Sequence, residues 1–461
     1  MSFAMCLSEL VAVTGGQLLL CDAKSETASF SQLSTDSRKI SAGDVYLALS
    51  GEQFDGHTFC QQAVKMGAIG LIVERQQAQD IPQLLVKSCH LALGAIAKYN
   101  RKKFQGPLIS VTGSNGKTTT KEMIAAILQV KGVTLATAGN LNNEIGVPLT
   151  LLGFNGQQQF SVIEMGANAK GEIAYCTDLA GPDVALITNA MGAHLEGFGS
   201  LQGVVEAKGE IFGGLTEKGT AILNFDDAAF PQWRQLTKDK KQLTFSLENN
   251  NADVYASDLV QTKTGSYGFK LNYQGASRTV NLKLLAIHNV KNALAAAASV
   301  LAIGGTLSQV VQGLQNATPV DGRLKTLPGL SGSTLIDDSY NGNPDSVKAG
   351  IDFLSTLSGC KVLALGDMAE LGKDECQLHT DIGGYAKTKG LHYVFSCGPK
   401  GRLAAKQFAI ENNSSPMAFD NRQEMIDALK MTVDKETKVL IKGSLSAGMK
   451  EVVQQLTAGG H

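Results

Sequence analysis

The chain has 461 residues, which exceeds one ordinary domain and leads us to expect about three. Hydrophobic residues make up 43% and charged residues 18%, so substantial cores are expected and disorder is not. Lysine and arginine number 41 against 42 aspartates and glutamates, a net charge of -1. This balance gives no bulk electrostatic reason to bind nucleic acid or an anionic membrane, so any phosphate must be held by local contacts.

The cysteines and the N-terminal segment indicate in which cellular compartment the protein is expected. Eight cysteines are scattered and no pair has CxxC spacing, which disfavours zinc and redox sites. The N-terminus lacks a basic region followed by an apolar run, and no stretch reaches about 18 apolar residues. We therefore expect a cytoplasmic protein with reduced thiols and no membrane insertion. Three self-contained cores also predict a monomer.

The first part of the chain mixes short strands and helices. Apolar runs at 44–51, 68–74 and 82–87 are typical of buried strands. The pattern changes at Pro107, where apolar strands that end in polar residues begin, as in a parallel α/β sheet. The alanine-rich stretch 289–303 predicts a helix.

A second alternation of strands and helices begins after about residue 318. Its apolar strands are STLIDDSY, KVLALGDM, HYVFSCG and TKVLIKGS. Amphipathic segments separate or follow them, at 345–357, 379–389, 400–412, 421–433 and 446–457. Such a βαβ array predicts a separate open-sheet domain. We therefore expect three α/β domains, at 1–104, 105–318 and 319–461.

A glycine-rich turn joins the first strand of the central domain to a helix. Its residues are Gly113, Ser114, Asn115, Gly116, Lys117, Thr118 and Thr119. Backbone N–H groups in such a turn cradle phosphate, a lysine reaches the β- and γ-phosphates, and a threonine hydroxyl suits magnesium. The usual pattern would need a glycine where Val111 stands, so a structural turn with a surface lysine is the alternative.

Acidic and basic side chains follow several of the central strands. Glu164 ends a buried strand, where a carboxylate can hold magnesium, or be a solvated strand end. His194 lies in a glycine-flanked loop after the next strand and is either a metal ligand or a surface histidine. Lys208 lies on a predicted helix, where spacing alone favours a solvated side chain.

Polar residues near the predicted domain boundary form a further set. Asn289 and Asn292 begin the alanine-rich helix, where they could contact an adenine or, for Asn289, cap the helix. Arg323 precedes the first strand of the last domain, and Asp338 ends it. An interdomain salt bridge and a strand-end turn are the structural alternatives for these two.

Together these motifs resemble the Mur ligase family over essentially the whole chain. The resemblance rests on their order: TGSNGKTTTKEM, GNLNNEIGVPLTLL, EMGA, the loop with His194, EAKGEIF, HNVKNA and GRL. It implies a small N-terminal α/β domain for a UDP-linked substrate, a central P-loop-type parallel-sheet ATPase domain and a C-terminal Rossmann-like domain. The loop TGSNGKTTT is this family's own variant, which accounts for Val111.

The resemblance also implies roles for individual residues. Thr118 and Glu164 match the ligands of the magnesium carried by ATP, and His194 matches a ligand of a second magnesium. Lys208 matches a lysine that reacts with carbon dioxide to a carbamate, an anion able to support that second ion. The matches for nucleotide contacts are Asn289 and Asn292, and those for residues brought to ATP by domain closure are Arg323 and Asp338.

The segments DDSYNGNPDSVKAGI and LALGDMAELG resemble the branch of the family that adds D-alanyl-D-alanine. This implies an ADP-forming ligase that joins D-alanyl-D-alanine to the terminal carboxylate of UDP-N-acetylmuramoyl-tripeptide through an acyl phosphate, in peptidoglycan precursor synthesis. The neighbouring branch, which adds lysine or diaminopimelate to the UDP-muramoyl dipeptide, is the alternative. A non-catalytic nucleotide-binding regulator is a third possibility, although it would be expected to lack some of the metal and phosphate residues.

The stretch 34–59 resembles the UDP-sugar domain that these two branches share. It implies that the uridine and diphosphate contacts are Ser37, Arg38, Asp55, Gly56 and His57. Folylpolyglutamate synthase, which shares the wider architecture, lacks this domain. One departure stands in the segment IKGSLSAGM, where Leu445 replaces a common arginine. Lys442 is the candidate to compensate for the missing charge.

Overall fold

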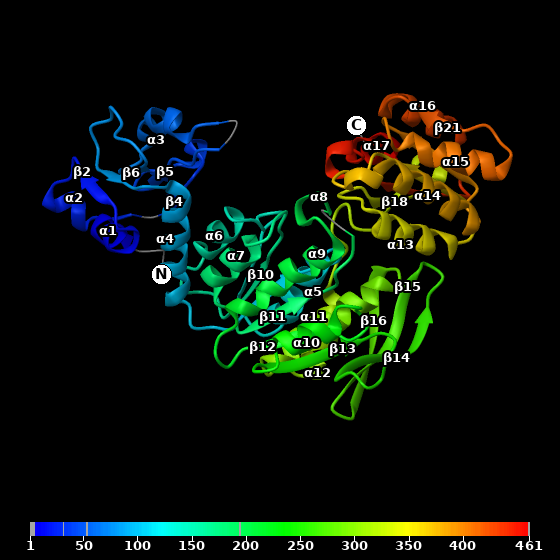
Figure 1. Cartoon of the computed structure of the whole chain (residues 1–461), viewed down its shortest axis with the longest axis horizontal. Coiled ribbons are helices and arrows are strands. Elements are labelled where there is room, and N and C mark those ends of the chain that lie inside the picture. Colours follow the sequence, from blue (N-terminus) through cyan, green and yellow to red (C-terminus); the bar gives the residue numbers. More distant parts are fainter. Residues whose placement is uncertain (1–4, 31, 52–53, 193–194, 460–461) are drawn as a thin grey trace.

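The computed structural model describes residues 5–30, 32–51, 54–192 and 195–459 and shows three α/β units. Figure 1 shows the N-terminal and C-terminal units at opposite ends of the view, with the central unit between and below them. Each unit has its own sheet and its own buried apolar clusters. The predicted α/β fold class is confirmed by this arrangement.

The N-terminal unit is a sheet in the strand order β2-β7-β6-β5-β4, in which only β2 runs antiparallel to its neighbour among the described residues. The strands are β2 (Gln17–Leu19), β4 (Leu33–Ser34), β5 (Val45–Leu47), β6 (Gly70–Val73) and β7 (Gln83–Leu85). The helices are α1 (Leu7–Thr14), α2 (Ala23–Thr27), α3 (Cys60–Met66) and α4 (Cys89–Lys103). A separate pair joins β1 (Met5–Cys6) to β3 (Ser29–Phe30).

The central sheet has the order β16-β15-β14-β13-β12-β11-β8-β10-β9. Its parallel strands are β8 (Leu108–Thr112), β9 (Thr134–Ala136), β10 (Phe160–Glu164), β11 (Val184–Ile187), β12 (Thr220–Asn224) and β13 (Lys241–Ser246). Around it lie α6 (Gly146–Leu151), α7 (Glu172–Ala180), α8 (Leu195–Phe198), α9 (Leu201–Gly209) and α10 (Phe230–Leu236). The strand pattern predicted after Pro107 is confirmed.

An antiparallel extension of this sheet did not figure in the sequence prediction. It consists of β14 (Val254–Gln261), β15 (Ser266–Tyr273) and β16 (Ala276–Leu285), which pair antiparallel with one another, while β14 itself pairs in parallel with β13. The second half of β16 alternates exposed and buried residues, because only one face of this extension meets the core. A prediction that relies on continuous apolar runs therefore misses these strands.

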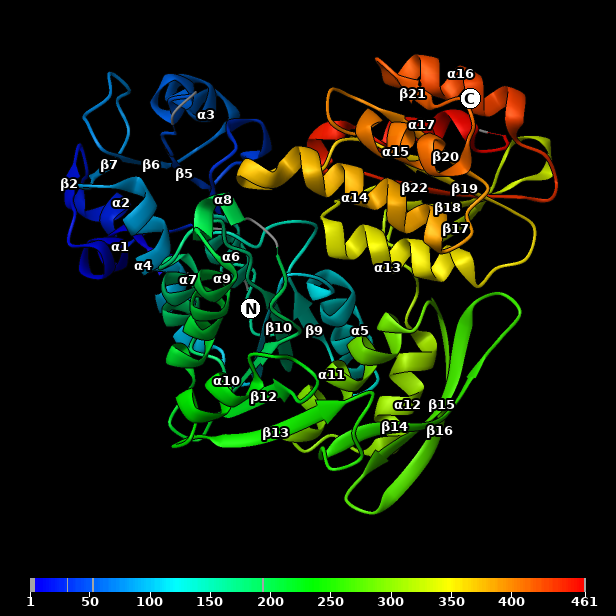
Figure 2. The ribbon, with the colours of Figure 1, turned by 45° about the vertical axis from the view of Figure 1, so that its right-hand side comes forward.

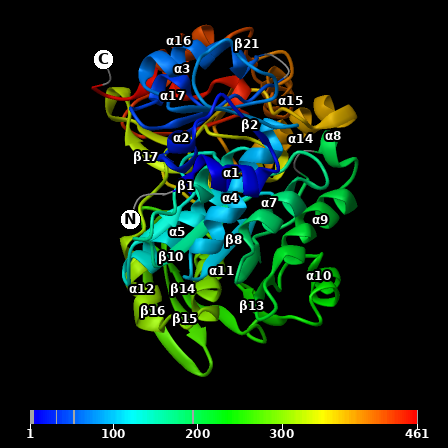
Figure 3. The same cartoon turned by 90° about the vertical axis from the view of Figure 1, so that its left-hand side faces the viewer.

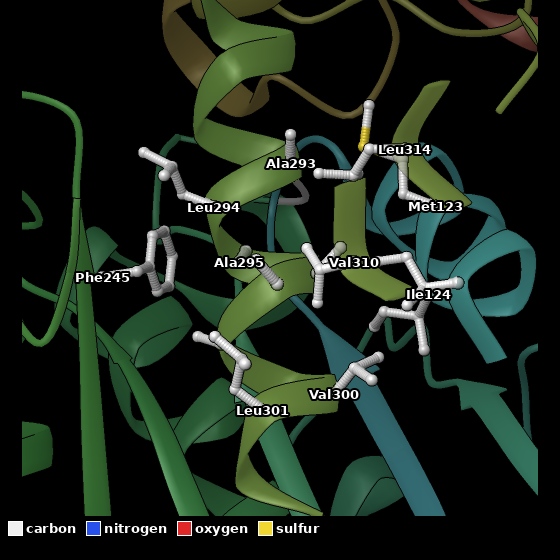
Figure 4. Close-up of a cluster of buried hydrophobic side chains, with 14 of the residues drawn as sticks. Met123, Ile124, Phe245, Ala293, Leu294, Ala295, Val300, Leu301, Val310 and Leu314 are labelled. Atoms are coloured by element: carbon white, nitrogen blue, oxygen red, sulfur yellow. The ribbon is translucent and has the colours of Figure 1, made fainter. Parts of the chain in front are cut away.

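The alanine-rich segment forms α11 (His288–Ala302), and its small side chains allow close packing on several sides. Figure 4 shows Leu294 of α11 facing Phe245 of β13, while Val300 lies toward Val310 of α12 (Leu307–Asn316). On the far side, Ile124 of α5 (Lys117–Gln129) belongs to the same buried cluster. This core fixes α5, and with it the loop that precedes α5.

The C-terminal unit has the strand order β17-β18-β22-β19-β20-β21, antiparallel only at β17 among the described residues. The strands are β17 (Lys325–Pro328), β18 (Thr334–Asp338), β19 (Cys360–Leu365), β20 (Tyr393–Cys397), β21 (Met417–Phe419) and β22 (Thr437–Lys442). The helices are α13 (Pro344–Ser355), α14 (Glu375–Thr388), α15 (Arg402–Asn412), α16 (Arg422–Thr432) and α17 (Lys450–Leu456). The predicted βαβ array is confirmed.

Contacts between the units define how they are joined. Helix α4 continues from the N-terminal unit onto the central one, between α1 and α7 (Figure 3). On it, Asn100 Nδ2 donates to the carbonyl oxygens of Leu151 and Phe154 at 3.0 and 3.2 Å. At the other end, α13 lies above the ends of β15 and β16 (Figure 2), and Leu285 packs into the C-terminal core. In the described residues, no helix is long and apolar enough to cross a membrane.

Candidate active site

The phosphate loop connects β8 to α5. Gly116 is the residue before α5 and has φ 81°, and Gly113 has φ 149°. A Cβ atom on Gly113 would lie 1.9 Å from Thr188 Oγ1, and one on Gly116 would lie 2.4 Å from Asn292 Oδ1. Both positions therefore require glycine. Val111 is a buried residue of β8, paired with Glu164 and Leu186, so the turn starts only after Thr112.

Lys117 is the first residue of α5 and folds back over the loop. Its Nζ donates to the carbonyl oxygens of Gly113 at 2.7 Å and Ser114 at 3.3 Å. Burial lowers the pKa of Lys117, nearby Glu164 opposes this shift, and Arg323 adds to it. A half-buried lysine among these charges is not the surface lysine of the alternative interpretation.

Glu164 ends β10 and is 1% exposed, which excludes a solvated strand end. Its Oε1 accepts hydrogen bonds from Thr118 Oγ1 at 3.2 Å and Asn142 Nδ2 at 2.8 Å. Its Oε2 is buried and has no hydrogen-bond partner among the residues that the structure describes. A buried carboxylate oxygen without a partner costs about 1–3 kcal/mol, so it calls for a cation or a donor.

These groups fit a magnesium ion that comes with a nucleotide. The described residues contain no cluster of three or more histidine, cysteine, aspartate or glutamate side chains that would hold a metal by themselves. Magnesium in nucleotide sites usually has only one or two carboxylate ligands, and phosphate and water complete its shell. The free oxygen of Glu164 beside the Thr118 hydroxyl matches that pattern. The predicted metal ligand His194 lies outside the described residues.

Lys208 lies on α9 and is 2% exposed, so the solvated side chain favoured by spacing is wrong. The side chain turns inward, and its Nζ lies 5.6 Å from the centroid of the Phe198 ring. Burial, together with the positive charge of Lys117, holds the pKa of Lys208 well below its usual value. A buried lysine of this kind is a neutral, nucleophilic amine over a wider pH range than an exposed one.

Asn289 and Asn292 lie on the first turns of α11 and are both buried. Ile287 precedes the helix as its N-cap, so the capping alternative for Asn289 is wrong. Asn289 Nδ2 donates to the Leu285 carbonyl at 2.7 Å, and Asn292 Nδ2 donates to Asn289 Oδ1 at 2.9 Å. The two amides thereby form a fixed pair beside Gly116.

The C-terminal unit places two further predicted residues here. Asp338 ends β18, and its Oδ2 lies 2.5 Å from Nζ of Lys442 at the end of β22. The guanidinium of Arg323 lies 4.1 Å from the centroid of the Tyr340 ring. Asp338 therefore forms its salt bridge with Lys442 within the C-terminal unit, and not between two domains as the structural alternative would require.

One cavity of about 390 Å³ brings most of these residues together. Its central-domain lining includes residues 114–119, Asn142, Glu164, Asn289 and Asn292. Its lining from beyond the central domain includes Arg323, Asp338, Tyr340, Asn343 and Lys442. Lys208 is not part of this lining, and the positive charge of Lys117 in the loop acts on it electrostatically.

Among the cavity residues that had no predicted site role are Asn142, Tyr340 and Asn343. Each lies in a segment that the sequence singled out, GNLNNEIG for Asn142 and DDSYNGNP for the other two. Each of these two segments contains several asparagines. This was the signal in the sequence that could have indicated a site, because asparagine amides both cap helices and bind ligands. The sequence could not separate these uses without knowing which side chains face the cavity.

The predicted UDP contacts lie in the N-terminal unit and not in the lining of this cavity. The Tyr46 hydroxyl donates to the Gly56 carbonyl at 2.9 Å. Ser37 is buried and donates from Oγ to Gln62 Oε1 at 3.1 Å. Arg38 forms an exposed ion pair with Asp36. Residues 37–38 follow β4, and residues 55–57 follow β5. These two strands are parallel neighbours, so the structure brings both segments to one edge of the sheet.

His57 and Asp55 are engaged within the protein. His57 is 3% exposed, its Nε2 accepts from the backbone N–H of Glu74 at 3.0 Å, and its Nδ1 lies 2.6 Å from Asp55 Oδ1. The Arg75 guanidinium, which donates to the same carboxylate, together with His57 holds the pKa of Asp55 far below its usual value. His57 therefore offers no free ring nitrogen to a ligand, and we interpret it as a support for the turn at Gly56.

A phosphate loop whose cavity is completed by a second α/β unit defines a multidomain nucleotide-dependent enzyme. The sequence matches three domain families in chain order. They are the Mur ligase family catalytic domain over residues 29–102, the Mur ligase middle domain over 111–300, and the Mur ligase glutamate ligase domain over 322–445. The chain therefore belongs to the Mur ligase family.

Its relatives match over nearly their whole length. The UDP-N-acetylmuramoyl-tripeptide–D-alanyl-D-alanine ligase of Escherichia coli (strain K12) is 41% identical over 98% of both chains. The crystal structure of MurF from Acinetobacter baumannii has a TM-score of 0.90 at 35% identity and is matched over 98% of both chains. MurF ligase from Thermotoga maritima, solved in complex with ADP, has a TM-score of 0.81 at 28% identity, over 92% of this chain and 96% of that one. The family predicted from the motifs is confirmed.

Proposed function

We propose that this enzyme is an ATP-dependent, ADP-forming ligase that joins D-alanyl-D-alanine to the terminal carboxylate of UDP-N-acetylmuramoyl-tripeptide, in peptidoglycan precursor synthesis. The observation that carries the proposal is the full-length identity of 41% to a ligase of that name. The same observation favours this branch over the one that adds lysine or diaminopimelate. The ADP bound in the Thermotoga maritima relative supports the nucleotide assignment of the loop.

The reaction has two chemical steps. The tripeptide carboxylate attacks the γ-phosphorus of ATP, which forms an acyl phosphate and releases ADP. The amine of D-alanyl-D-alanine then attacks the acyl carbon, and the tetrahedral intermediate expels phosphate, loses the amine proton and becomes the amide. The first step brings two anions together, so we assign charge neutralisation to Lys117 and Arg323. The remaining residues act mainly by positioning.

We assign the magnesium of ATP to Thr118 and Glu164, on the basis of the unpartnered Glu164 oxygen beside the Thr118 hydroxyl. A magnesium ion there would neutralise charge on the phosphates of ATP. A second ion with His194 as ligand follows only from the family resemblance. Asn289 and Asn292 are the proposed nucleotide contacts, and their mutual hydrogen bond fixes both amides before ATP arrives.

We further propose that Lys208 is carbamylated. Its neutral amine adds to carbon dioxide with loss of one proton, which gives a carbamate with a single negative charge. The buried position and the lowered pKa of Lys208 support this reactivity. The modification places an anion at a buried position where the positive charge of Lys117 disfavours a cation, and this anion would be a suitable partner for a second magnesium.

The three predicted domains then hold one substrate each. The N-terminal domain (1–104) binds the UDP moiety through Ser37, Arg38 and the turn from Asp55 to Gly56. The central domain (105–318) binds ATP, and the C-terminal domain (319–461) brings Arg323 and Asp338 to it. Closure of this kind excludes water from the acyl phosphate. A monomer and a cytoplasmic location stay predictions from the sequence.

Phosphate release tests the proposed function directly. We would incubate the protein with ATP, magnesium and UDP-muramoyl tripeptide, with and without D-alanyl-D-alanine, and identify the product by mass spectrometry. Release that needs both substrates and yields the UDP-pentapeptide supports the proposal. Release with the UDP-dipeptide and a diamino acid instead would assign the chain to the neighbouring branch. Nucleotide binding without release under any pairing would favour a regulator.

A further inference from the structure

Lys121 is a fully buried lysine for which the proposed mechanism has no use. It lies on α5, four residues after Lys117 and three after Thr118, so it is one helical turn away from each of them. Its side chain is 1% exposed. A buried ammonium group carries a desolvation cost, and an apolar residue of similar length would fill the same volume. Packing alone therefore does not account for a lysine here.

The ammonium group of Lys121 joins α5 to the segment after β9. Its Nζ donates to the carbonyl oxygen of Thr137 at 2.7 Å and to Glu122 Oε1 at 2.6 Å. Thr137 is 1% exposed and follows the last residue of β9. Helix α5 lies beside β9 and β10 in Figure 2. The bond to a main-chain carbonyl therefore fixes where this segment leaves the sheet.

That segment contacts Glu164 at two points. At its start, the Thr137 hydroxyl oxygen accepts a hydrogen bond of 2.9 Å from the backbone N–H of Glu164. Five residues on, Asn142 Nδ2 donates to the Glu164 carboxylate, and the Asn142 carbonyl accepts from the N–H of Gly166 at 2.7 Å. The segment thus holds both the backbone and the side chain of Glu164.

These contacts form a closed ring with α5. Lys121 binds Thr137, Thr137 binds Glu164, and Glu164 accepts from Thr118, which lies one turn before Lys121 on the same helix. We propose that Lys121 is a positioning residue for the magnesium–nucleotide site, which sets the place of the Glu164 carboxylate relative to Thr118. This inference rests on the proposed function only in its assignment of the metal site.

Magnesium-dependent ADP binding tests this role without any peptide substrate. We would measure ADP affinity by calorimetry with and without magnesium, for the wild type and Lys121→Met. We expect the gain in affinity from magnesium to fall about tenfold or more in Lys121→Met, while affinity without magnesium changes less than twofold. A magnesium gain equal to that of the wild type would overturn the proposal. If Lys121→Met does not fold, Lys121→Gln takes its place under the same criteria.

Two further variants separate positioning from a general loss of stability. Glu122→Gln removes the exposed charge partner but leaves the bond to the Thr137 carbonyl, so it should keep the magnesium gain. Thr137→Val breaks the next link of the ring and should reduce the gain, with no further loss when combined with Lys121→Met. Independent losses in the double variant would contradict the ring. A wild type that binds magnesium and ADP but makes no UDP-pentapeptide would refute the ligase proposal and leave this test in force.

Discussion

Asn343 of the C-terminal unit donates a hydrogen bond of 3.0 Å from its Nδ2 to Oδ1 of Asn115 in the phosphate loop, 228 residues earlier in the chain. Asn343 is also the N-cap of α13, where its Oδ1 accepts from the N–H of Ser346. One side chain therefore starts a helix with its oxygen and contacts the nucleotide loop with its nitrogen. This is a direct link by which the position of the C-terminal unit can affect the loop.

Substitution of Asn343 should separate these two uses. Asn343→Ser keeps a capping oxygen but loses the bond to Asn115, so we expect a nearly unchanged melting temperature and a kcat/KM reduced about tenfold, since one hydrogen bond is worth about 0.5–1.5 kcal/mol. Asn343→Ala loses both and should in addition lower stability by about 1 kcal/mol. Chemical unfolding and steady-state kinetics measure the two effects. Equal kinetics of Asn343→Ser and the wild type would show that the contact does not serve catalysis.

Lys117→Ala should abolish turnover and leave the fold intact. Among the described residues, the hydrogen bonds of the Lys117 ammonium group go to two carbonyl oxygens of its own loop, so the substitution breaks no hydrogen bond to another element. We expect a loss in kcat of at least about 10³-fold, because the charge that we assign to the γ-phosphate is then absent during phosphoryl transfer. Circular dichroism and a melting curve serve as the folding control. Near-normal turnover would refute the assignment of the loop.

Lys208 provides a prediction about carbon dioxide and pH. Lys208→Ala should be nearly inactive and partly restored by a short carboxylate such as formate or acetate, which replaces the carbamate. In the wild type, activity should fall when bicarbonate is removed and as the pH falls through the lowered pKa of Lys208, because only the neutral amine reacts. Full activity of Lys208→Ala without added carboxylate would refute the carbamate.

The same residue affects stability in a definite direction. The pKa of unmodified Lys208 is lower in the folded chain than the usual 10.5, so the unfolded chain binds more protons at pH values between the two. The free energy of unfolding should therefore rise with pH across that window and decrease as the pH falls through it. Lys208→Met should flatten this dependence. Denaturant unfolding at several pH values, in buffer free of carbon dioxide, measures it.

The sequence predicted elements best where the signal was local. The helix at 289–303 and the last-domain strands were found because alanine content and apolar runs depend on neighbouring residues only. The antiparallel extension at 254–285 was missed because its alternation is partial and its pairing is set by the turn geometry between strands. Single-sequence patterns carry little of that information.

The same limit applies to the site. The phosphate loop could be predicted because consecutive residues form it, whereas the bond between Asn115 and Asn343 joins two domains. The burial of Lys208 could not be predicted from residue spacing either, since an exposed and an inward-facing lysine fit the same helical pattern. Only the family resemblance singled out Lys208, and only the structure shows that its ammonium group is buried beside Phe198.

The ion pair between Asp338 and Lys442 provides a test that separates stability from catalysis. The side chains are 13% and 3% exposed, and Lys442 Nζ also donates to the Asn341 carbonyl at 3.0 Å. Asp338→Asn leaves Lys442 buried without its counter-charge, so we expect a loss of stability of about 3–5 kcal/mol. The double variant with Lys442→Met removes the uncompensated charge and should recover most of that stability.

Activity should not recover in the double variant if Asp338 acts on closure over ATP. We expect turnover to stay low in both variants, while the affinity for UDP-muramoyl tripeptide, which we propose to bind at the N-terminal domain, changes little. Calorimetry with that substrate and steady-state turnover give the two quantities. A double variant with restored turnover would show that the pair is only structural. A selective loss of UDP-substrate affinity would move Asp338 from the closing of the ATP cavity to the binding of the acceptor.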